Sequence, residues 1–184
     1  MKFLSVLFFL ATTFVSSFAH AATGDPVDKR FSLGVGTYST VIAYDDSFLA
    51  DDEFSGISLS FAYAVSDVLS LRATYFSQDH DTFSSIESTG FDFLGHVGLN
   101  MGSPGFKAYI GGGIFSEEWE AGSLSQTFNG LQLSGGIGYN WESVALDFIL
   151  NLRDASDYES SFNIVSPNVN AAAASGSLLL SFRF

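Results

Sequence analysis

Eight segments of this chain alternate apolar and polar residues with a period of two, and this alternation restricts the fold more than any other feature. In the last segment Leu178, Leu180, Phe182 and Phe184 alternate with residues that include Ser177, Ser181 and Arg183. A period of two places the two sets of side chains on opposite faces of a β-strand. The sequence therefore predicts an all-β chain, with strands at about residues 30–43, 55–65, 68–77, 89–99, 106–116, 128–139, 144–153 and 176–184.

The connections between these segments are alternately long and short. The long ones are residues 44–54, 78–88, 117–127 and 154–170, and the short ones are 66–67, 100–105 and 140–143. Transmembrane β-barrels have long external loops and short periplasmic turns. Because the number of strands is even, the first strand begins and the last strand ends on the side of the short turns. We therefore predict that both mature termini are periplasmic.

Charged residues are rare, and this indicates which face of each strand points outward. They make up 15% of the chain, whereas 47% is hydrophobic; soluble domains contain about 25% charged residues. The strand charges all lie opposite the aliphatic and aromatic face: Arg72, Asp92, Lys107, Asp147, Arg153 and Arg183. A soluble sandwich or lipocalin-like barrel, the alternative, would have too few charges to cover its exterior. Residues 30–184 are thus predicted to form an eight-stranded antiparallel up-and-down transmembrane β-barrel.

The first 21 residues predict a secretory signal peptide. Lys2 precedes the apolar run Phe3–Leu10, and Ala19-His20-Ala21 is a small-x-small cleavage site. The alternative, a membrane anchor, is disfavoured because the apolar run is short. Residues 22–29 then predict a short periplasmic lead-in. The net charge of −13 excludes a nucleic-acid-binding role, which needs clusters of Lys and Arg.

Inward-facing charges form the main candidate site, a structural network in the barrel lumen. Its members are Arg72, Asp92, His96, Lys107, Asp147 and Arg183. An unpaired charge in a narrow lumen is costly, so we expect the arginines and aspartates to pair across it, with Lys107 near the periplasmic mouth. The apolar inward residues predict a filled interior: Phe76, Leu94, Tyr109, Phe115, Ile149 and Leu179. A gated ion path is the alternative.

The long connections hold most of the 20 acidic residues and no Lys or Arg. Carboxylates are ligands for hard divalent cations, so Ca²⁺ or Mg²⁺ is a candidate bridge between these loops and lipopolysaccharide phosphates. The candidate contacts are Asp45, Asp46, Asp51, Asp52, Glu53, Asp79 and Asp81. The alternative is a solvated acidic surface, and no metal centre or other cofactor is assigned.

The sequence contains no clear catalytic motif. Gly34-Val35-Gly36 and Gly111–Gly113 lie in strand patterns with no following helix, which argues against a nucleotide loop. The glycines are expected to leave room for large side chains inside the barrel. The mature chain has two histidines, His80 in an expected loop and His96 facing inward. No nucleophile, base and acid follow a recognisable spacing, so the sequence predicts no enzyme.

Three stretches resemble the small eight-stranded outer-membrane proteins, the OmpA/OmpX-like and porin-family barrels. They are Lys107–Gly113, Leu133–Tyr139 and the ending Gly176–Phe184. The resemblance covers the whole mature chain and is one of pattern. It implies an outer-membrane location, contact with lipid and lipopolysaccharide, and recognition of Phe182 and Phe184 by the outer-membrane assembly machinery. No peptidoglycan-binding domain is expected, because the chain ends at the eighth strand.

A structural or surface-interaction role is the function that these features favour. We expect the barrel to be a monomer that supports envelope integrity and makes contacts through its acidic external loops. The alternative is a narrow pore or a channel for hydrophobic solutes.

Overall fold

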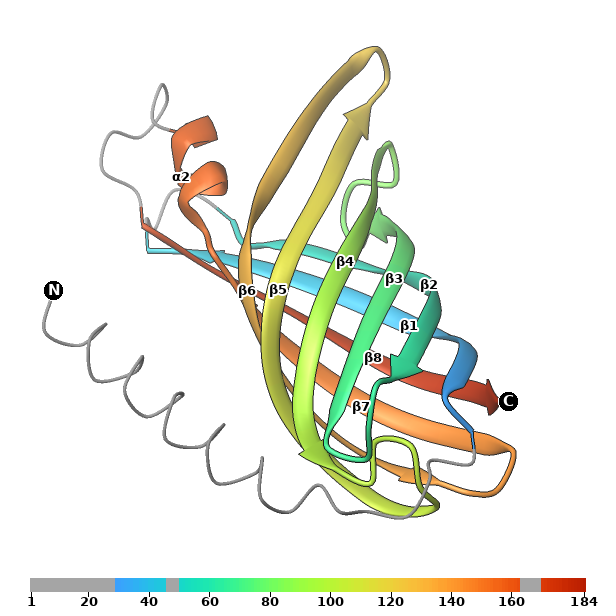
Figure 1. Ribbon diagram of the computed structural model, residues 1–184. Coiled ribbons are helices and arrows are strands. Elements are labelled where there is room, and N and C mark those ends of the chain that lie inside the picture. The colour runs from blue at the N-terminus through green and yellow to red at the C-terminus, as the bar shows by residue number, and fades with distance from the viewer. Residues whose placement is uncertain (1–28, 46–49, 163–169) are drawn as a thin grey trace, which may run out of the picture.

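The structure is a computed structural model, which describes residues 29–45, 50–162 and 170–184. The predicted signal peptide, almost all of the lead-in and the candidate cation contact Asp46 lie outside the described residues. The described part of the chain folds into eight strands and one short helix (Figure 1).

The strands form a closed antiparallel barrel in which each strand pairs with the next and β8 returns to pair with β1. The predicted eight-stranded up-and-down barrel is therefore confirmed. The strands are β1 (Phe31–Tyr44), β2 (Asp52–Ala64), β3 (Leu69–His80), β4 (Ile86–Leu99), β5 (Gly105–Ala121), β6 (Leu124–Asn140), β7 (Val144–Arg153) and β8 (Ala171–Arg183).

The outer face of the barrel is apolar and the inner face is polar. Val35, Ile57 and Phe91 point outward with 61%, 72% and 61% of their surface exposed. Ser60 and Gln78, by contrast, are buried inside. A soluble barrel has the opposite arrangement, so this exterior suits contact with lipid rather than water. The six strand charges named from the sequence are buried on the inner face, as predicted. Glu53, Asp79 and Glu120, in the parts of the strands near the loop end, are exposed.

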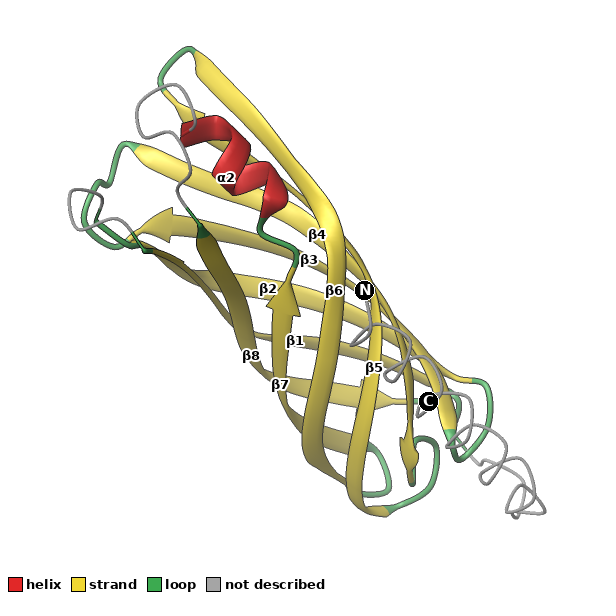
Figure 2. Cartoon of the chain, turned by 90° about the vertical axis from the view of Figure 1, so that its left-hand side faces the viewer, coloured by secondary structure: helices red, strands yellow, loops and turns green. Residues whose placement is uncertain are grey.

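The two ends of the barrel differ. The turn end carries the short connections 65–68, 100–104 and 141–143, the start of β1 and the end of β8. The loop end carries the other four connections and the helix α2 (Ser156–Phe162) (Figure 2). Among the described residues, no helix is long and apolar enough to cross a membrane.

Strands at the loop end are longer than the sequence indicated. The prediction of a long loop at residues 117–127 is wrong, because β5 and β6 continue as a hairpin until Ala121 pairs with Leu124. This hairpin projects beyond the neighbouring strands (Figure 1). The connection between β3 and β4 likewise shrinks to residues 81–85. Backbone pairing persists here although the outer face becomes polar, and the apolar-outward alternation that marks the membrane strands is lost.

Glycine inside the barrel makes room for a large ring, as expected from the sequence. Gly136 lies on β6 directly opposite Tyr109 of β5. A Cβ atom at Gly136 would stand 2.6 Å from the Tyr109 ring, much closer than a normal contact. Gly135 faces outward, and a Cβ there would have its nearest neighbour at 3.8 Å. The inward glycine therefore allows the Tyr109 ring to lie across the lumen.

Candidate functional site

Asp147 on β7 is the centre of one buried charge cluster near the turn end. Its Oδ2 lies 2.8 Å from Lys107 Nζ and 3.4 Å from Arg72 Nη2. The Tyr109 hydroxyl donates to the other oxygen at 2.9 Å. These residues, the Asp147 cluster, are all at least nine-tenths buried. Two cations share one carboxylate, so the cluster has an excess of one positive charge.

Arg153, the last residue of β7, is the centre of a second cluster nearer the loop end. Its Nη1 donates to Glu117 Oε2 at 2.6 Å, and its Nη2 donates to Asp92 Oδ1 at 3.2 Å and to the Tyr38 hydroxyl at 2.9 Å. Gln132 Nε2 also donates to Asp92 Oδ1, at 2.9 Å. One cation here meets two carboxylates, so this cluster has an excess of one negative charge.

Aromatic rings fill the space around the Arg153 guanidinium. The ring centroids of Phe115 and Phe76 lie 4.5 and 5.3 Å from its central carbon, within the range of cation–π contact. The Tyr38 ring stacks on Phe76 with centroids 4.3 Å apart, and its hydroxyl bonds to Asp92 and to Ser175 of β8.

These side chains form a layer that crosses the lumen, which we call the Arg153 layer. It consists of Tyr38, Phe76, Asp92, Phe115, Glu117, Gln132, Arg153 and Ser175, which come from seven of the eight strands. All eight residues are buried. The layer of paired charges and stacked rings links nearly all strands of the barrel wall to one another. It also obstructs the interior of the barrel.

Helix α2 covers the Arg153 layer from the loop end. Tyr158 is completely buried against Ile42, Phe54, Phe115 and Phe128, and its hydroxyl donates to Glu117 Oε1 at 2.7 Å. Burial, and then the Glu117 carboxylate, raise the pKa of this hydroxyl, so it stays protonated and remains a donor. The helix thereby supplies a second donor, beside Trp119 Nε1 at 2.9 Å, to the Glu117 oxygen that Arg153 does not reach.

The same helix lies along a free stretch of β6. Pairing between β6 and β7 begins at Gln132, so residues 124–131 of β6 extend past the end of β7. Asp157 of α2 accepts the Asn129 backbone N–H at 2.9 Å, and Gln126 donates to Ser161. The wall between β6 and β8 is thus completed at this height by α2 instead of a strand.

The single lumen network predicted from sequence is in fact two clusters. Arg72, Lys107 and Asp147 come together, with Lys107 toward the turn end as expected. Asp92 belongs to the separate Arg153 layer. The predicted pairing of Arg183 with an aspartate is wrong, because its guanidinium donates to the backbone carbonyls of Trp141, at 2.6 Å, and Gly102. It lies where the β8 end meets two turns, and their carbonyls are its closest acceptors.

His96 is fully buried between the two clusters and is not part of an ion pair. Its Nε2 lies 3.0 Å from Ser134 Oγ, and its ring packs against Tyr109. This serine–histidine contact was not foreseen from sequence. Its Nδ1 has no partner among the described residues, so the orienting carboxylate of a catalytic triad is missing there. The pair is also sealed inside the barrel, and its arrangement favours a packing role.

Two central residues of the lumen were not recognised as network members. The sequence pattern predicts Arg153 only as an inward charge and places Glu117 in a loop. A signal for Glu117 did exist, since it continues the series of inward odd-numbered residues on β5 that contains Lys107, Tyr109 and Phe115. The inward apolar residues predicted to fill the interior, Phe76, Leu94, Tyr109, Phe115, Ile149 and Leu179, are all buried.

The acidic residues of the loop end are dispersed and mostly occupied. Asp45 accepts hydrogen bonds from the Asn170 side chain and backbone, which lower the pKa of its carboxyl. Asp51 accepts from the Tyr44 backbone, Asp52 from the Tyr44 hydroxyl and Asp81 from Ser55. Glu53 and Asp79 are exposed at strand ends.

His80, expected in a loop, instead ends β3 and is buried. Its Nδ1 accepts the backbone N–H groups of Thr82 and Phe83 at 3.0 and 3.1 Å. The proton of the neutral ring therefore lies on Nε2, which donates to Asp52. No group of three His, Asp or Glu side chains that could hold a metal ion occurs in the described part of the chain. Bridging of loop carboxylates to lipid phosphates by divalent cations stays a prediction.

The fold is shared with known outer-membrane barrels. The sequence matches no protein-family model and no curated protein, but solved structures align over most of the chain. The attachment invasion locus protein Ail of Yersinia pestis aligns with a TM-score of 0.56 and 12% identity, over 85% of this chain and 99% of its own. Neisserial surface protein A gives a TM-score of 0.59 and 17% identity, over 84% of this chain and 97% of its own.

A third similar structure is the outer membrane protein OprG of Pseudomonas aeruginosa, with a TM-score of 0.56 and 12% identity over 85% of this chain and 97% of its own. At these levels of identity the likeness establishes the fold. The predicted resemblance to small eight-stranded outer-membrane barrels is confirmed at that level.

Proposed function

We propose that the protein is a closed outer-membrane barrel with a structural and surface-interaction role, and that it does not form a pore. The observation that carries this proposal is the Arg153 layer, which joins seven strands across the lumen. The fully buried Phe76, Leu94 and Leu179 fill more of the same interior. Because the lumen is filled, other molecules would interact with the outer surface and the loop end of the barrel.

The membrane setting follows from the apolar exterior. The turn end would face the periplasm and the acidic loop end the outside, as in barrels with short periplasmic turns. The barrel would act as a monomer among phospholipid and lipopolysaccharide and would have no catalytic activity. Phe182 and Phe184 stack on each other on the outer face, with centroids 6.1 Å apart, so both rings are accessible for the assembly machinery to recognise.

Solute flux through vesicles tests the closed lumen. We expect vesicles containing the refolded protein to retain small ions and small sugars as well as protein-free vesicles do, because the charges and rings of the Arg153 layer fill the path. Insertion is checked separately through β-sheet circular dichroism and protease resistance. Rapid loss of ions from vesicles with correctly inserted barrels would contradict the proposal and favour a narrow pore.

Passage of hydrophobic solutes is a second candidate, favoured by the gap between β6 and β8. Among the described residues α2 alone completes the wall above Arg153, and it is joined to Gln126 and to Asn129 by one hydrogen bond each. Departure of α2 would open the upper lumen sideways at the outer edge of the membrane. In the same vesicles, faster entry of an apolar dye without ion leakage would identify this lateral route. Equal entry with and without protein would exclude it.

A further inference from the structure

The basic residues of the described chain gather at the turn end. Lys29, Arg30, Arg72, Lys107 and Arg183 all lie there, and Arg153 is the exception. Two carboxylates of this end are already engaged. Asp67 accepts the backbone N–H groups of Gly102 and Ser103, and Asp147 is shared by two cations. With the exposed Glu142, three side-chain carboxylates of the described residues stand against five cations at this end, so the positive charge of the rim is incompletely balanced by neighbouring side chains.

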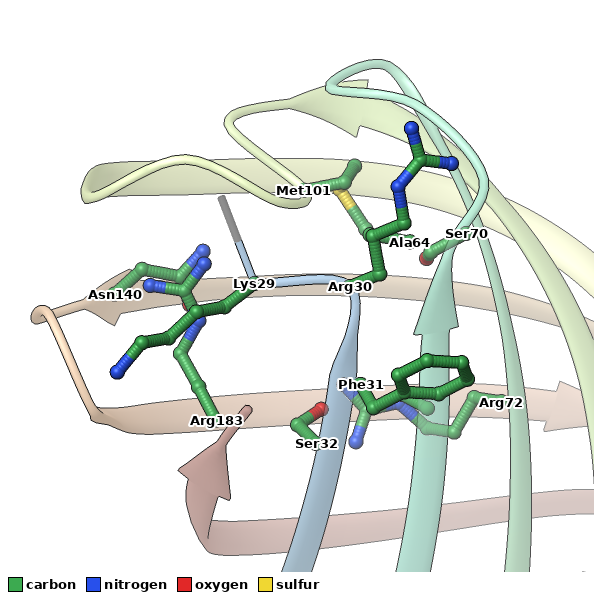
Figure 3. Close-up of a pocket in the computed structure, with 11 residues that line it drawn as sticks. Lys29, Arg30, Phe31, Ser32, Ala64, Ser70, Arg72, Met101, Asn140 and Arg183 are labelled. Atoms are coloured by element: carbon green, nitrogen blue, oxygen red, sulfur yellow. The ribbon is translucent and has the colours of Figure 1, made fainter. Parts of the chain in front are cut away.

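A small pocket opens among these cations, and its lining contains no acidic residue. Eleven residues line it, and four are cationic: Lys29, Arg30, Arg72 and Arg183. Figure 3 shows Lys29 and Arg183 gathered with Asn140 on one side of the pocket. Its volume is about 20 Å³, which is room for roughly one water-sized group. A ligand would thus place one or two oxygen atoms in it and leave its remainder outside.

Donor groups in the pocket are only partly used. Arg72 is 5% exposed, and its Nε has no partner among the described residues. Lys29 Nζ donates to Ser143 Oγ at 2.7 Å, which leaves two of its three N–H bonds for other acceptors. The exposed Arg30 has one contact, 3.4 Å from the Val65 carbonyl. An oxyanion at this position would therefore meet several N–H donors and no carboxylate of the pocket lining, while Asp147 lies behind it, 3.4 Å from Arg72 Nη2.

Aromatic residues place the pocket at the level of lipid headgroups. Phe31 lines it and also belongs to an outward group with Phe61, Tyr63 and Phe184, whose centroids lie 5.0 to 6.0 Å from its own. Girdles of aromatic residues mark the membrane–water interfaces of transmembrane barrels. A group that reaches the pocket along this surface comes from the headgroup layer of the adjoining leaflet.

We propose that this pocket binds the phosphate of an anionic phospholipid. A phosphate oxygen enters between Lys29, Arg72 and Arg183, Arg30 faces the rest of the headgroup, and the acyl chains lie against Phe31 and its aromatic neighbours. This inference rests on the proposed function in one respect, namely that the turn end adjoins a phospholipid leaflet. It adds a specific lipid class and a site for it.

Native mass spectrometry of the protein in nonionic detergent tests this site. The protein is titrated separately with phosphatidylglycerol, phosphatidylcholine and inorganic phosphate. We expect one phosphatidylglycerol to bind more tightly than phosphatidylcholine or phosphate. The double variant Lys29→Gln/Arg30→Gln should lose roughly tenfold in affinity, since each basic residue near a membrane surface attracts anionic lipid. Glu142→Gln is the matched control, because this exposed residue of the same rim does not line the pocket.

Each other outcome has a definite meaning. Equal phosphatidylglycerol affinity of the wild type and the double variant would overturn the site, and so would equal affinity for both lipids. Inorganic phosphate that binds as tightly as phosphatidylglycerol would show a free-anion site and overturn the lipid assignment. Circular dichroism and protease resistance in vesicles are measured in parallel. Failure to insert would count against the proposed function itself, whereas insertion without lipid selectivity would refute this inference alone.

Discussion

Arg153→Met is expected to destabilise the barrel by about 3–5 kcal/mol, the usual loss when one partner of a buried ion pair is removed. Methionine preserves most of the side-chain length, but Asp92 and Glu117 are then buried without their shared cation. The rings of Phe76 and Phe115 also lose their cation–π partner. Urea unfolding in phospholipid vesicles, followed by tryptophan fluorescence, measures the change.

The control for this variant is Arg30→Met, which removes an exposed arginine with one long hydrogen bond. In phosphatidylcholine vesicles, which contain no anionic lipid, it should change the free energy of unfolding little. A triple variant, Arg153→Met with Asp92→Asn and Glu117→Gln, should recover much of the loss because no uncompensated charge remains. If Arg153→Met unfolds at the same urea concentration as the wild type, Arg153 does not hold the layer together.

Asp147→Asn should have an effect of similar size, about 3–5 kcal/mol, because it leaves two buried cations without a carboxylate. Arg72 and Lys107 would then repel each other at the turn end of the lumen. Asparagine has nearly the same shape as aspartate, so packing and the hydrogen bond from Tyr109 are preserved. The loss therefore reports the charge, and the same urea titration measures it.

The excess positive charge of the Asp147 cluster predicts an asymmetry between its members. Lys107→Met leaves one cation for one carboxylate and should cost less than Asp147→Asn. Glu142→Gln serves as the control for removing an acidic residue from this end, since Glu142 is exposed in the turn between β6 and β7. Equal losses for Lys107→Met and Asp147→Asn would show that the cluster does not carry the charge imbalance described above.

Alternation, together with the low charge content and the alternating lengths of the connections, was sufficient to predict the barrel, its closure and the face of nearly every strand residue. It could not predict where the strands end. Outside the membrane the outer face of a strand meets water instead of lipid, so Glu118 and Glu120 break the pattern while β5 continues its pairing with β6. The helix α2 was missed for a similar reason, since its seven residues form too short a stretch to show a helical period.

The composition of the candidate site was predicted better than its pairing. Alternation shows that Asp92, Asp147 and Arg153 face inward, but not the height at which each meets its neighbours. That height depends on the tilt and stagger of the strands, which place Arg153 beside Asp92 and leave Asp147 with Lys107. Arg183 was misassigned because the carbonyls of Trp141 and Gly102 become acceptors only when the turns fold beside it.

The accessibility of the lumen is the most direct test of a closed barrel, and the absence of native cysteine makes it simple. Ser177 points inward on β8 between Ser175 of the Arg153 layer and the buried Leu179. Ser177→Cys is treated in vesicles with a small charged thiol reagent, beside Ser123→Cys at the exposed turn of the β5–β6 hairpin. We predict that the cysteine at 123 reacts at once and that the one at 177 reacts only when the barrel unfolds. Equal rates at the two positions would contradict the closed lumen.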